Sequence, residues 1–410
     1  MKRTVVGIAF AVVPIILGAA VAFGRPLSLY GDAAPSVAAA DGLRDDAARL
    51  RVGAERTEEY LPLVEGRRVA VLAHAASTVG DEHLVDMLCR KGVNVTGIFS
   101  PEHGFRGDAD AGEKVGDSVD AATGIPIRSL YDGRTLRPSD EVMRSFDVLL
   151  VDMQDVGLRF YTYYIAMLRM IDACAEFGRD VVILDRPNPN GMYVDGPVLD
   201  MRYKSGVGAL PIPVVHGMTL GEIARMAVGE GWAKSADITV VPVENYRRST
   251  RYVLPVAPSP NLPTQHSVYL YPSLCLFEGT AVSLGRGTDF PFEVYGHPDM
   301  KGCDFSFTPQ PRAGAKNPPL CGCECFGTDL RGKADEEIIA EGFNLEYVID
   351  AYRRLDMGEK FFTPFFEKLV GVDYVRRMII DGHTAAEIRG KWQPDVESFM
   401  QRRRPYLLYE

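Results

Sequence analysis

The class of fold follows from the stretch Val148-Leu149-Leu150-Val151-Asp152-Met153-Gln154-Asp155, in which an apolar run ends in polar side chains. Two further apolar runs, Val93 to Phe99 and Val181 to Leu184, also end in polar motifs. Such short runs are typical of strands buried on both faces of a parallel sheet. If the three strands are neighbours, their motifs meet at one sheet edge, where open α/β sheets bind their ligands.

Segments with helical spacing alternate with strand-like runs in the first part of the chain. The predicted strands are 68–73, 93–99, 125–131, 147–152, 180–185 and 238–243, and the predicted helices are 82–90, 138–145, 163–177 and 220–228. This alternation predicts an α/β fold with a Rossmann-like, largely parallel sheet. We assign residues 52–254 to this catalytic domain.

The composition of the sequence changes near Leu254, because four prolines follow within ten residues, at positions 255, 258, 260 and 263. Beyond them we predict strands over 274–284 and 304–308, and helices over 345–355, 372–378 and 385–390. Residues 255–410 are therefore expected to form a smaller, mixed α+β C-terminal domain. The active site is expected in the cleft between the two domains.

The first 51 residues are predicted to serve export. Lys2 and Arg3 precede an apolar run from Val5 to Phe23, and Ala20-Val21-Ala22 supplies a cleavage site. This pattern predicts a signal peptide over 1–22, followed by a flexible leader over 23–51. An uncleaved membrane anchor is the alternative, but the cleavage site favours removal, without stable membrane insertion afterwards. A periplasmic or secreted protein is expected.

The net charge and the cysteines limit which partners, disulfides and metal sites the protein can be expected to have. A formal charge of −10 argues against a nucleic-acid partner. Three of the seven cysteines, Cys89, Cys174 and Cys275, are predicted to be core residues. The run Cys321-Gly322-Cys323-Glu324-Cys325 lacks the usual spacing of zinc ligands, and a loop with a disulfide or buried thiols is expected instead. We expect neither a metal nor another cofactor.

The first polar motif, Ser100-Pro101-Glu102-His103-Gly104-Phe105-Arg106-Gly107, holds the candidate general acid. Glu102 follows a proline, and a neighbouring phenylalanine could shield its carboxyl group so that it holds a proton near neutral pH. His103 and Arg106 are candidate substrate-binding residues. The alternative is a carboxylate that only ties its loop to Arg106.

The second motif runs from the end of one strand towards a helix. Its candidate substrate-binding residues are Asp152, Gln154, Asp155, Arg159 and Tyr161. Aromatic surface and a guanidinium suit a sugar that carries an acid. The alternative is that Asp155 pairs with Arg159 and that the tyrosines belong to the core.

The third motif adds Asp185, Arg186 and Asn188, and a later strand end adds His216. The amide of Asn188 could bind hydroxyl groups, whereas Asn190 is expected to stabilise a turn. A lone histidine is more often structural, although His216 could also act as an acid, a base or a ligand.

Beyond residue 254, the candidates are Asn261, Glu278 and Arg286. The loop Gly285-Arg286-Gly287-Thr288 matches no phosphate-binding fingerprint and is expected to present Arg286 to the cleft. Either Glu278 or Glu293 could be a second catalytic carboxylate. A structural ion pair with Arg286 is an equally good interpretation.

From about Val52 to its end, the chain resembles the NamZ-type exo-β-N-acetylmuramidases. The resemblance rests on the three motifs above and on Pro258-Ser259-Pro260-Asn261-Leu262-Pro263, Leu276-Phe277-Glu278-Gly279-Thr280 and Gly285-Arg286-Gly287-Thr288. It implies release of N-acetylmuramic acid (MurNAc) from the non-reducing ends of peptidoglycan fragments, with Glu102 as the catalytic acid. Two positions depart from the family pattern: His74 replaces a frequent asparagine, and Leu284 replaces a frequent acidic residue.

The sequence therefore predicts an exported exo-acting glycoside hydrolase whose partners are peptidoglycan fragments. The lactyl carboxylate of MurNAc would suit Arg106, Arg159, Arg186 or Arg286. One rival is a metal-assisted hydrolase that uses Asp152, Asp155, Asp185 and His216. Another is a muropeptide-binding protein without catalysis.

Overall fold

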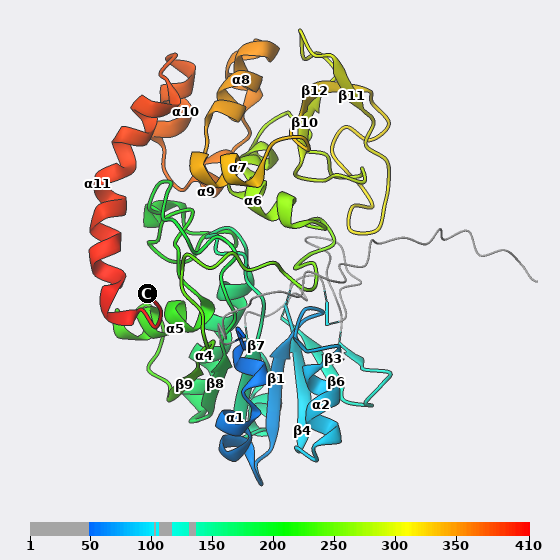
Figure 1. Cartoon of the computed structure of the whole chain (residues 1–410), viewed down its shortest axis with the longest axis vertical. Coiled ribbons are helices and arrows are strands. Elements are labelled where there is room, and N and C mark those ends of the chain that lie inside the picture. Colours follow the sequence, from blue (N-terminus) through cyan, green and yellow to red (C-terminus); the bar gives the residue numbers. More distant parts are fainter. Residues whose placement is uncertain (1–48, 102–103, 106–116, 131–136) are drawn as a thin grey trace, which may run out of the picture. The chain divides into compact units, whose positions relative to one another are not determined.

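The computed structural model describes residues 49–101, 104–105, 117–130 and 137–410. Its larger sheet has seven strands in the order β5-β6-β4-β1-β7-β8-β9 (Figure 1). They are β1 (Val69–Ala73), β4 (Val95–Ser100), β5 (Ser118–Val119), β6 (Pro126–Ser129), β7 (Val148–Asp152), β8 (Asp180–Leu184) and β9 (Ile238–Val241). Every neighbouring pair is parallel except β5 with β6. The predicted parallel sheet is confirmed.

Helices cover both faces of this sheet because alternate strand residues point to opposite sides. Leu72 pairs with Val151, and both belong to the apolar cluster that includes side chains of α3 (Asp140–Arg144), α4 (Tyr163–Phe177) and α5 (Leu220–Gly229). Val71 pairs with Leu150, and both belong to a second cluster with α1 (Thr57–Val64) and α2 (Leu84–Arg90). The short ribbon β2 (Thr78–Val79) and β3 (Glu82–His83) lies between β1 and α2 in the chain.

The later residues form a smaller antiparallel sheet with helices, which confirms the α+β expectation. The sheet has the order β10-β12-β11, with β10 (Val294–His297), β11 (Phe305–Phe307) and β12 (Cys325–Asp329). The helices are α6 (Gln265–Leu274), α7 (Asp335–Glu341), α8 (Glu346–Leu355), α9 (Phe366–Val370), α10 (Tyr374–Ile380) and α11 (Ala385–Arg403). Short 3₁₀ segments are η1 (Gly53–Glu55), η2 (Met201–Tyr203), η3 (Cys275–Gly279), η4 (Gly358–Phe361) and η5 (Arg404–Tyr406). The boundary expected at residue 254 stays a prediction.

The predicted strand over 274–284 is wrong. The chain there completes α6 and continues as η3, and α6 begins at a capping box between Thr264 and Ser267. Eight consecutive residues of α6, from Ser267 to Leu274, are buried. A helix buried all round has no polar face, so its hydrophobic period disappears and its aromatic residues imitate a strand.

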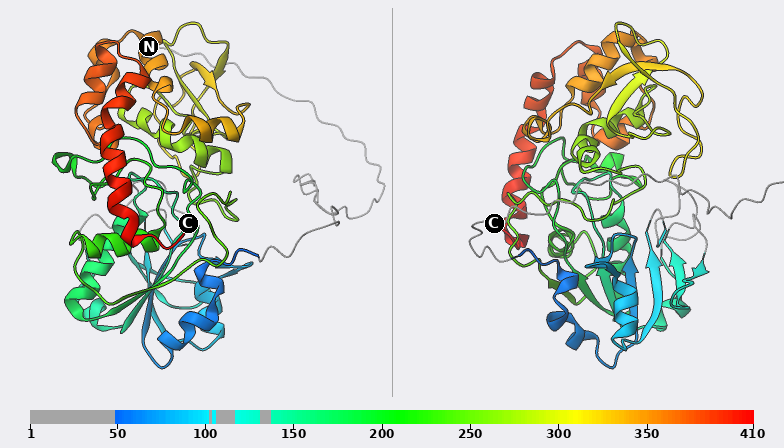
Figure 2. Two further views of the ribbon diagram at one scale, coloured as in Figure 1. Left: turned by 60° about the vertical axis from the view of Figure 1, so that its left-hand side comes forward. Right: turned by 45° about the vertical axis from the view of Figure 1, so that its right-hand side comes forward.

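The predicted helix over 385–390 begins correctly but continues to Arg403 (Figure 2). Gly390 and Pro394 suggest an earlier end, yet Trp392, Val396 and Phe399 are buried in the core and hold the helix together beyond them. The end of α11 binds the region around α5, where the Arg402 side chain donates to Glu230 at 2.7 Å. Packing at a distance therefore overrides the local helix-breaking signals.

All seven cysteines are free thiols. Cys174 and Cys275 are buried as predicted, but Cys89 is exposed, so its assignment to the core is wrong. It lies on the face of α2 opposite the buried residues of that helix. Of the two alternatives predicted for the 321–325 loop, a disulfide or buried thiols, the structure has free thiols, with Cys325 buried and Cys321 and Cys323 exposed.

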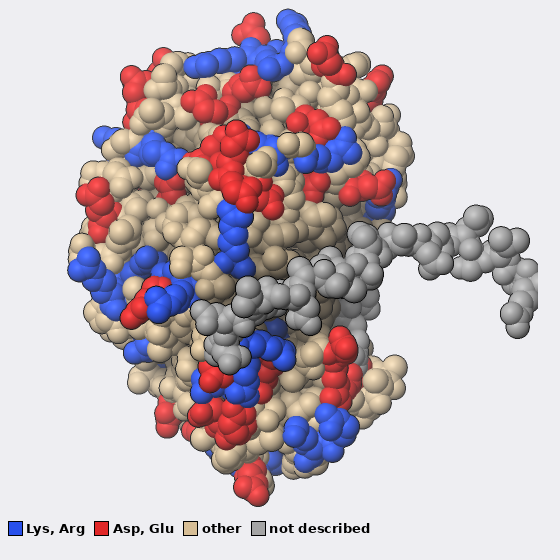
Figure 3. Space-filling model, in the orientation of Figure 1, with Lys and Arg blue, Asp and Glu red and all other residues tan. Residues whose placement is uncertain are grey.

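On the face drawn in Figure 3, lysine and arginine side chains are interspersed with aspartate and glutamate. Across the described residues, the helices are too short or too polar to cross a membrane. The predicted signal peptide over 1–22, and the predicted leader up to residue 48, lie outside the described residues.

Candidate active site

The described residues of the three sequence motifs lie at one edge of the larger sheet, as predicted. They follow β4, β7 and β8, which are parallel, with β1 between β4 and β7. The chain order reverses at β1, because β4 and β6 are added on one side and β7 to β9 on the other. Such a reversal opens a crevice at the carboxyl ends of the strands. The loops after β1 and β7 border it.

Three candidates of the first motif, Glu102, His103 and Arg106, lie outside the described residues. The residues that flank them are buried at the sheet edge. Phe105 is 3% exposed, and its ring lies 4.7 Å from the ring of His83. His83 in turn lies within 3.0 Å of the His74 carbonyl oxygen, in the loop after β1. The chain on either side of the candidate acid is thereby anchored beside β1.

Asp152 and Arg186 form an ion pair beneath this edge. The Asp152 carboxylate accepts from the Arg186 Nε at 2.5 Å and from Nη2 at 2.9 Å, and the two side chains are 0% and 3% exposed. Arg186 also donates to the carbonyl oxygen of Thr78 at 2.8 Å. This placement does not fit substrate binding by either residue, because both charges are already neutralised inside the protein. The pair joins β7 to the chain after β8.

Arg159 likewise serves an internal role rather than the expected one. Its guanidinium donates to four backbone carbonyl oxygens, those of Pro197, Ile212, Leu369 and Val370, at 2.6–3.0 Å. The residue is 0% exposed, and burial lowers its pKa to about 10. It therefore does not fit as a ligand for a substrate carboxylate, nor does it pair with Asp155. It ties the motif after β7 to α9.

Gln154 and Asp155 form a buried turn. The Gln154 amide donates to the carbonyl oxygens of Asp155 and Pro187, and Asp155 Oδ1 accepts from the Gly157 N–H at 2.6 Å. Gly157 is required because its φ is +81° and a Cβ would lie 2.1 Å from Asn188. Burial raises the pKa of Asp155 to about 7, and its Oδ2 has no hydrogen bond among the described residues. This acid is therefore partly protonated near neutral pH.

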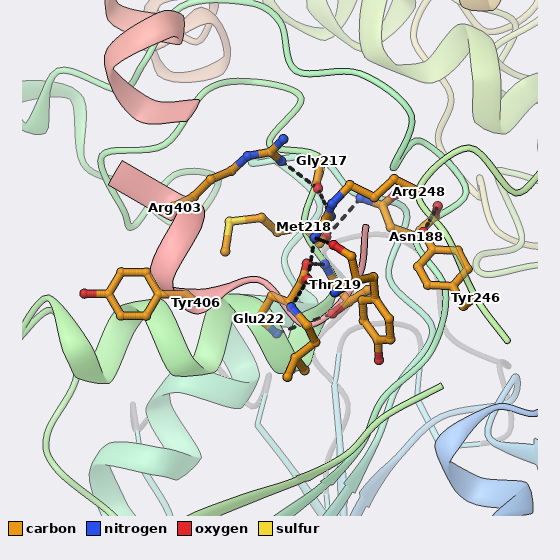
Figure 4. Close-up of polar contacts among 12 residues, drawn as sticks. Asn188, Gly217, Met218, Thr219, Glu222, Tyr246, Arg248, Arg403 and Tyr406 are labelled. Carbon is orange, nitrogen blue, oxygen red and sulfur yellow. Dashed lines mark hydrogen bonds and ion pairs between the residues drawn. The ribbon is translucent and has the colours of Figure 1, made fainter. Parts of the chain in front are cut away.

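Asp185, Asn188 and His216 belong to a polar network that anchors the C-terminal residues. Figure 4 shows part of it, with Asn188, Thr219, Arg248 and Arg403 labelled. Asp185 accepts from the Thr219 hydroxyl and from the Tyr409 hydroxyl, both at 2.6 Å, and burial raises its pKa to about 6. The Asn188 amide donates to the Met218 carbonyl oxygen at 2.9 Å. These contacts assign the residues to the fold rather than to a ligand.

His216 is a neutral member of the same network. Its Nδ1 accepts from the Met218 N–H at 3.2 Å, and burial together with nearby Arg403 lowers its pKa to about 3. Its carbonyl oxygen accepts from Arg403, and Arg248 pairs with Glu222 close by. Across the described residues, no three His, Cys, Asp or Glu side chains are grouped so that they could hold a metal ion. The acids and the histidine of the metal-assisted rival are thus not gathered around one point.

The remaining candidates, Tyr161, Asn261, Glu278 and Arg286, surround a cavity of about 100 Å³. Its lining also includes Tyr163, Ser259, Tyr271 and Phe292. A larger cavity of about 610 Å³ shares Glu278 and Arg286 with the first, and is also lined by Leu284, Lys316, Asn317 and Phe365. The small cavity is thus lined from both sides of residue 254, by the motif after β7 and by the later loops.

His74, which departs from the family pattern, lies next to this wall of tyrosines. Its Nε2 accepts from the Gln154 N–H at 2.9 Å, and its ring lies 4.8 Å from the ring of Tyr163. The hydroxyl of Tyr161 donates to the Pro258 carbonyl oxygen at 2.8 Å. The histidine therefore supports the tyrosines from the loop after β1. Leu284, the second departure, contributes an apolar surface to the larger cavity.

Arg286 and Glu278 form an ion pair on the wall that the two cavities share. The arginine Nε and Nη2 both donate to Glu278 Oε1, at 3.0 and 2.5 Å, and the side chains are 18% and 26% exposed. The guanidinium lies 5.0 Å from the centre of the Phe292 ring. Sequence reasoning missed Phe292, Tyr271 and Lys316 because no local pattern distinguishes them from core or surface residues.

The parallel sheet and the cavity beside its carboxyl edge define an α/β enzyme with a site for a polar substrate. Residues 69–266 match the family model described as exo-beta-N-acetylmuramidase NamZ, N-terminal, and residues 269–409 match the C-terminal model of the same family. The chain therefore belongs to the NamZ exo-β-N-acetylmuramidase family and is a glycoside hydrolase. The resemblance seen in the sequence is confirmed.

Known relatives agree with this assignment. The peptidoglycan beta-N-acetylmuramidase NamZ of Bacillus subtilis (strain 168) is 34% identical over 411 residues, which cover 95% of this chain and 99% of that protein. Two crystal structures of DUF1343 family proteins from Bacteroides fragilis NCTC 9343 are also similar. They are 55% and 26% identical, with TM-scores of 0.83 and 0.72, and each match covers 88% of this chain and 99% of the other.

Proposed function

We propose that this enzyme releases MurNAc from the non-reducing ends of peptidoglycan fragments. The observation that carries the proposal is the cavity at the carboxyl edge of the sheet, where Arg286 is partly exposed beside tyrosines and an asparagine. Membership of the family over nearly the whole chain supports the same activity. A muramic acid ring combines an apolar face, hydroxyl groups and a carboxylate, and this lining suits all three.

Within this proposal, Glu102 is the general acid that protonates the glycosidic oxygen as the bond to C1 breaks. It belongs to the motif that follows β4, and the flanking residues Pro101 and Phe105 are buried at the same edge as the cavity-lining motif after β7. Among the described candidates, Arg286 is the arginine that can bind the lactyl carboxylate, since Arg159 and Arg186 are engaged internally. The side chains around the larger cavity of about 610 Å³, which shares Arg286 and Glu278 with the small one, bind the ring and the N-acetyl group.

An envelope location fits this substrate, because peptidoglycan lies outside the cytoplasmic membrane. We accordingly propose that residues 1–22 direct export and that the mature enzyme acts in the periplasm or after secretion. No part of the proposed chemistry requires a cofactor.

The mature enzyme is expected to release free MurNAc from MurNAc–GlcNAc and 4-nitrophenol from 4-nitrophenyl β-MurNAc. The GlcNAc glycoside should remain intact because it lacks the lactyl carboxylate. Product analysis by liquid chromatography, with and without a chelator, measures both. Inhibition by the chelator would favour the metal-assisted rival, and binding of the disaccharide without release would favour a binding protein.

Arg286→Gln should lower kcat/KM for 4-nitrophenyl β-MurNAc by about 10–100-fold, because a charged hydrogen bond contributes about 1.5–3 kcal/mol. The same glycoside with a lactamide in place of the lactyl acid should be affected less, because it loses only the support that Arg286 gives to Glu278. Kinetics on the two substrates separate loss of recognition from general damage. Equal losses on both would contradict the assignment of Arg286 to the carboxylate.

A further inference from the structure

Glu278 is the only carboxylate among the described residues that line either cavity. The other candidate for a second catalytic acid, Glu293, lines neither of them. Glu293 is 7% exposed, and its Oε1 accepts from the Thr264 hydroxyl. The sequence leaves the choice between these two glutamates open. Their positions favour Glu278, because it lines the cavities and Glu293 does not.

The backbone that carries Glu278 is held tightly. Phe277 is fully buried, and its ring stacks on that of Tyr295 at 4.8 Å. On the other side, Gly279 packs so closely that a Cβ would lie 2.5 Å from the Cα of Phe366. Because both neighbours are locked by packing, the carboxylate is presented to the cavities from a fixed position.

The backbone around Arg286 is also held in one conformation. Gly285 and Gly287 on either side have φ values of +84° and +82°, which other residues rarely adopt. Phe292, whose ring lies beneath the guanidinium, has a φ of +62° although it is not a glycine. Backbone strain of this kind persists where the surrounding structure fixes a functional group.

The ion pair leaves hydrogen-bonding capacity on both partners. Among the described residues, the contact of Glu278 is to Oε1, which accepts from Arg286 Nε and Nη2. Within the described part of the chain, Glu278 Oε2 and Arg286 Nη1 have no hydrogen-bond partner. The pair can therefore accept a second carboxylate at the arginine, and a water molecule at the free glutamate oxygen.

We propose that Glu278 is the second catalytic carboxylate of this enzyme, and this inference rests on the proposed muramidase function. As the bond between C1 and the leaving oxygen breaks, a general acid gives its proton to that oxygen. The oxygen of a water molecule bonds to C1 from the opposite face, and the proton of that water passes to Glu278. One water is consumed, and each sugar leaves with a hydroxyl group.

Arg286 links this step to substrate recognition. In the free enzyme its guanidinium pairs with the Glu278 carboxylate. When the lactyl carboxylate binds Arg286, the same guanidinium contacts both the substrate's acid and Glu278. The residue that recognises the lactyl group is therefore also the partner of the proposed base.

The test is Glu278→Ala assayed on 4-nitrophenyl β-MurNAc with and without sodium azide. Without azide, kcat should fall by about 10²–10⁴-fold, the usual contribution of a positioned base. Azide needs no proton removed, so it should restore turnover and yield the α-glycosyl azide, identified by NMR. Glu278→Gln, which keeps the shape of the side chain, should show the same loss.

Glu359→Ala is the matched control, since Glu359 is exposed and lines neither cavity. Folding of each variant is checked by circular dichroism and thermal unfolding. A folded Glu278→Ala enzyme with near wild-type turnover, or one that is inactive and forms no azide product, would overturn the inference. Failure of the wild-type enzyme to release MurNAc would instead refute the proposed function itself.

Discussion

Glu102→Gln is expected to lower kcat for MurNAc–GlcNAc by about 10²–10⁴-fold, because the amide cannot donate the proton that the leaving sugar requires. The loss should be much smaller on 4-nitrophenyl β-MurNAc, since 4-nitrophenolate departs without protonation. Steady-state kinetics on both substrates measure the difference. KM should change little on either, because the glutamine keeps the size and polarity of the side chain.

This prediction separates a general acid from a glutamate that only ties its loop to Arg106. A structural role would lower turnover of the natural and the activated substrate by similar factors. Near wild-type turnover of both would contradict the acid assignment outright. Glu359→Gln serves as a control for the removal of one negative charge from an exposed position.

The second large effect is expected on the free energy of unfolding, when the buried ion pair between Asp152 and Arg186 is broken. Asp152→Ala should lower the free energy of unfolding by about 3–5 kcal/mol, because it leaves the Arg186 charge buried without its partner. The two side chains are 0% and 3% exposed, so water cannot replace the lost carboxylate. Urea unfolding followed by circular dichroism gives the difference between the variant and the wild type.

An exposed ion pair provides the control for this measurement. Asp289 pairs with Arg312, and their side chains are 75% and 44% exposed. Asp289→Ala should change the free energy of unfolding by no more than about 1 kcal/mol, because solvent screens such pairs. If Asp152→Ala were no more destabilising than this control, the buried pair would not be a structural tie. Its arginine would then return as a candidate for ligand binding.

Much of the fold was predictable from local patterns. The apolar runs before Asp152 and Asp185 predicted buried parallel strands, and the spacing over 163–177 predicted α4 to the residue. The prediction failed where burial was complete on all sides, as in α6, because a helix without a polar face has no helical period. It also failed at the end of α11, where Trp392 and Phe399 hold the helix together past Gly390.

The candidate site was likewise predictable in part from the sequence. Residue types and motif order pointed to sugar chemistry and to the edge of the sheet where it takes place. They did not show which charged side chains face a cavity, because that depends on partners far away in the chain. Arg159 and Arg286 look equally suitable in the sequence, yet only Arg286 borders the cavity.

The strand and helix pattern, the family and the set of polar residues at the sheet edge all follow from the amino-acid sequence. These are local properties, read from spacing and residue type. The roles of these polar residues depend instead on the partners that folding brings to them. The guanidinium of Arg159 donates to carbonyl oxygens 210 and 211 residues further along the chain. The side chain of Arg286, in contrast, is partly exposed beside Glu278. A charge remains available to a ligand only where folding leaves its hydrogen-bonding capacity unfilled.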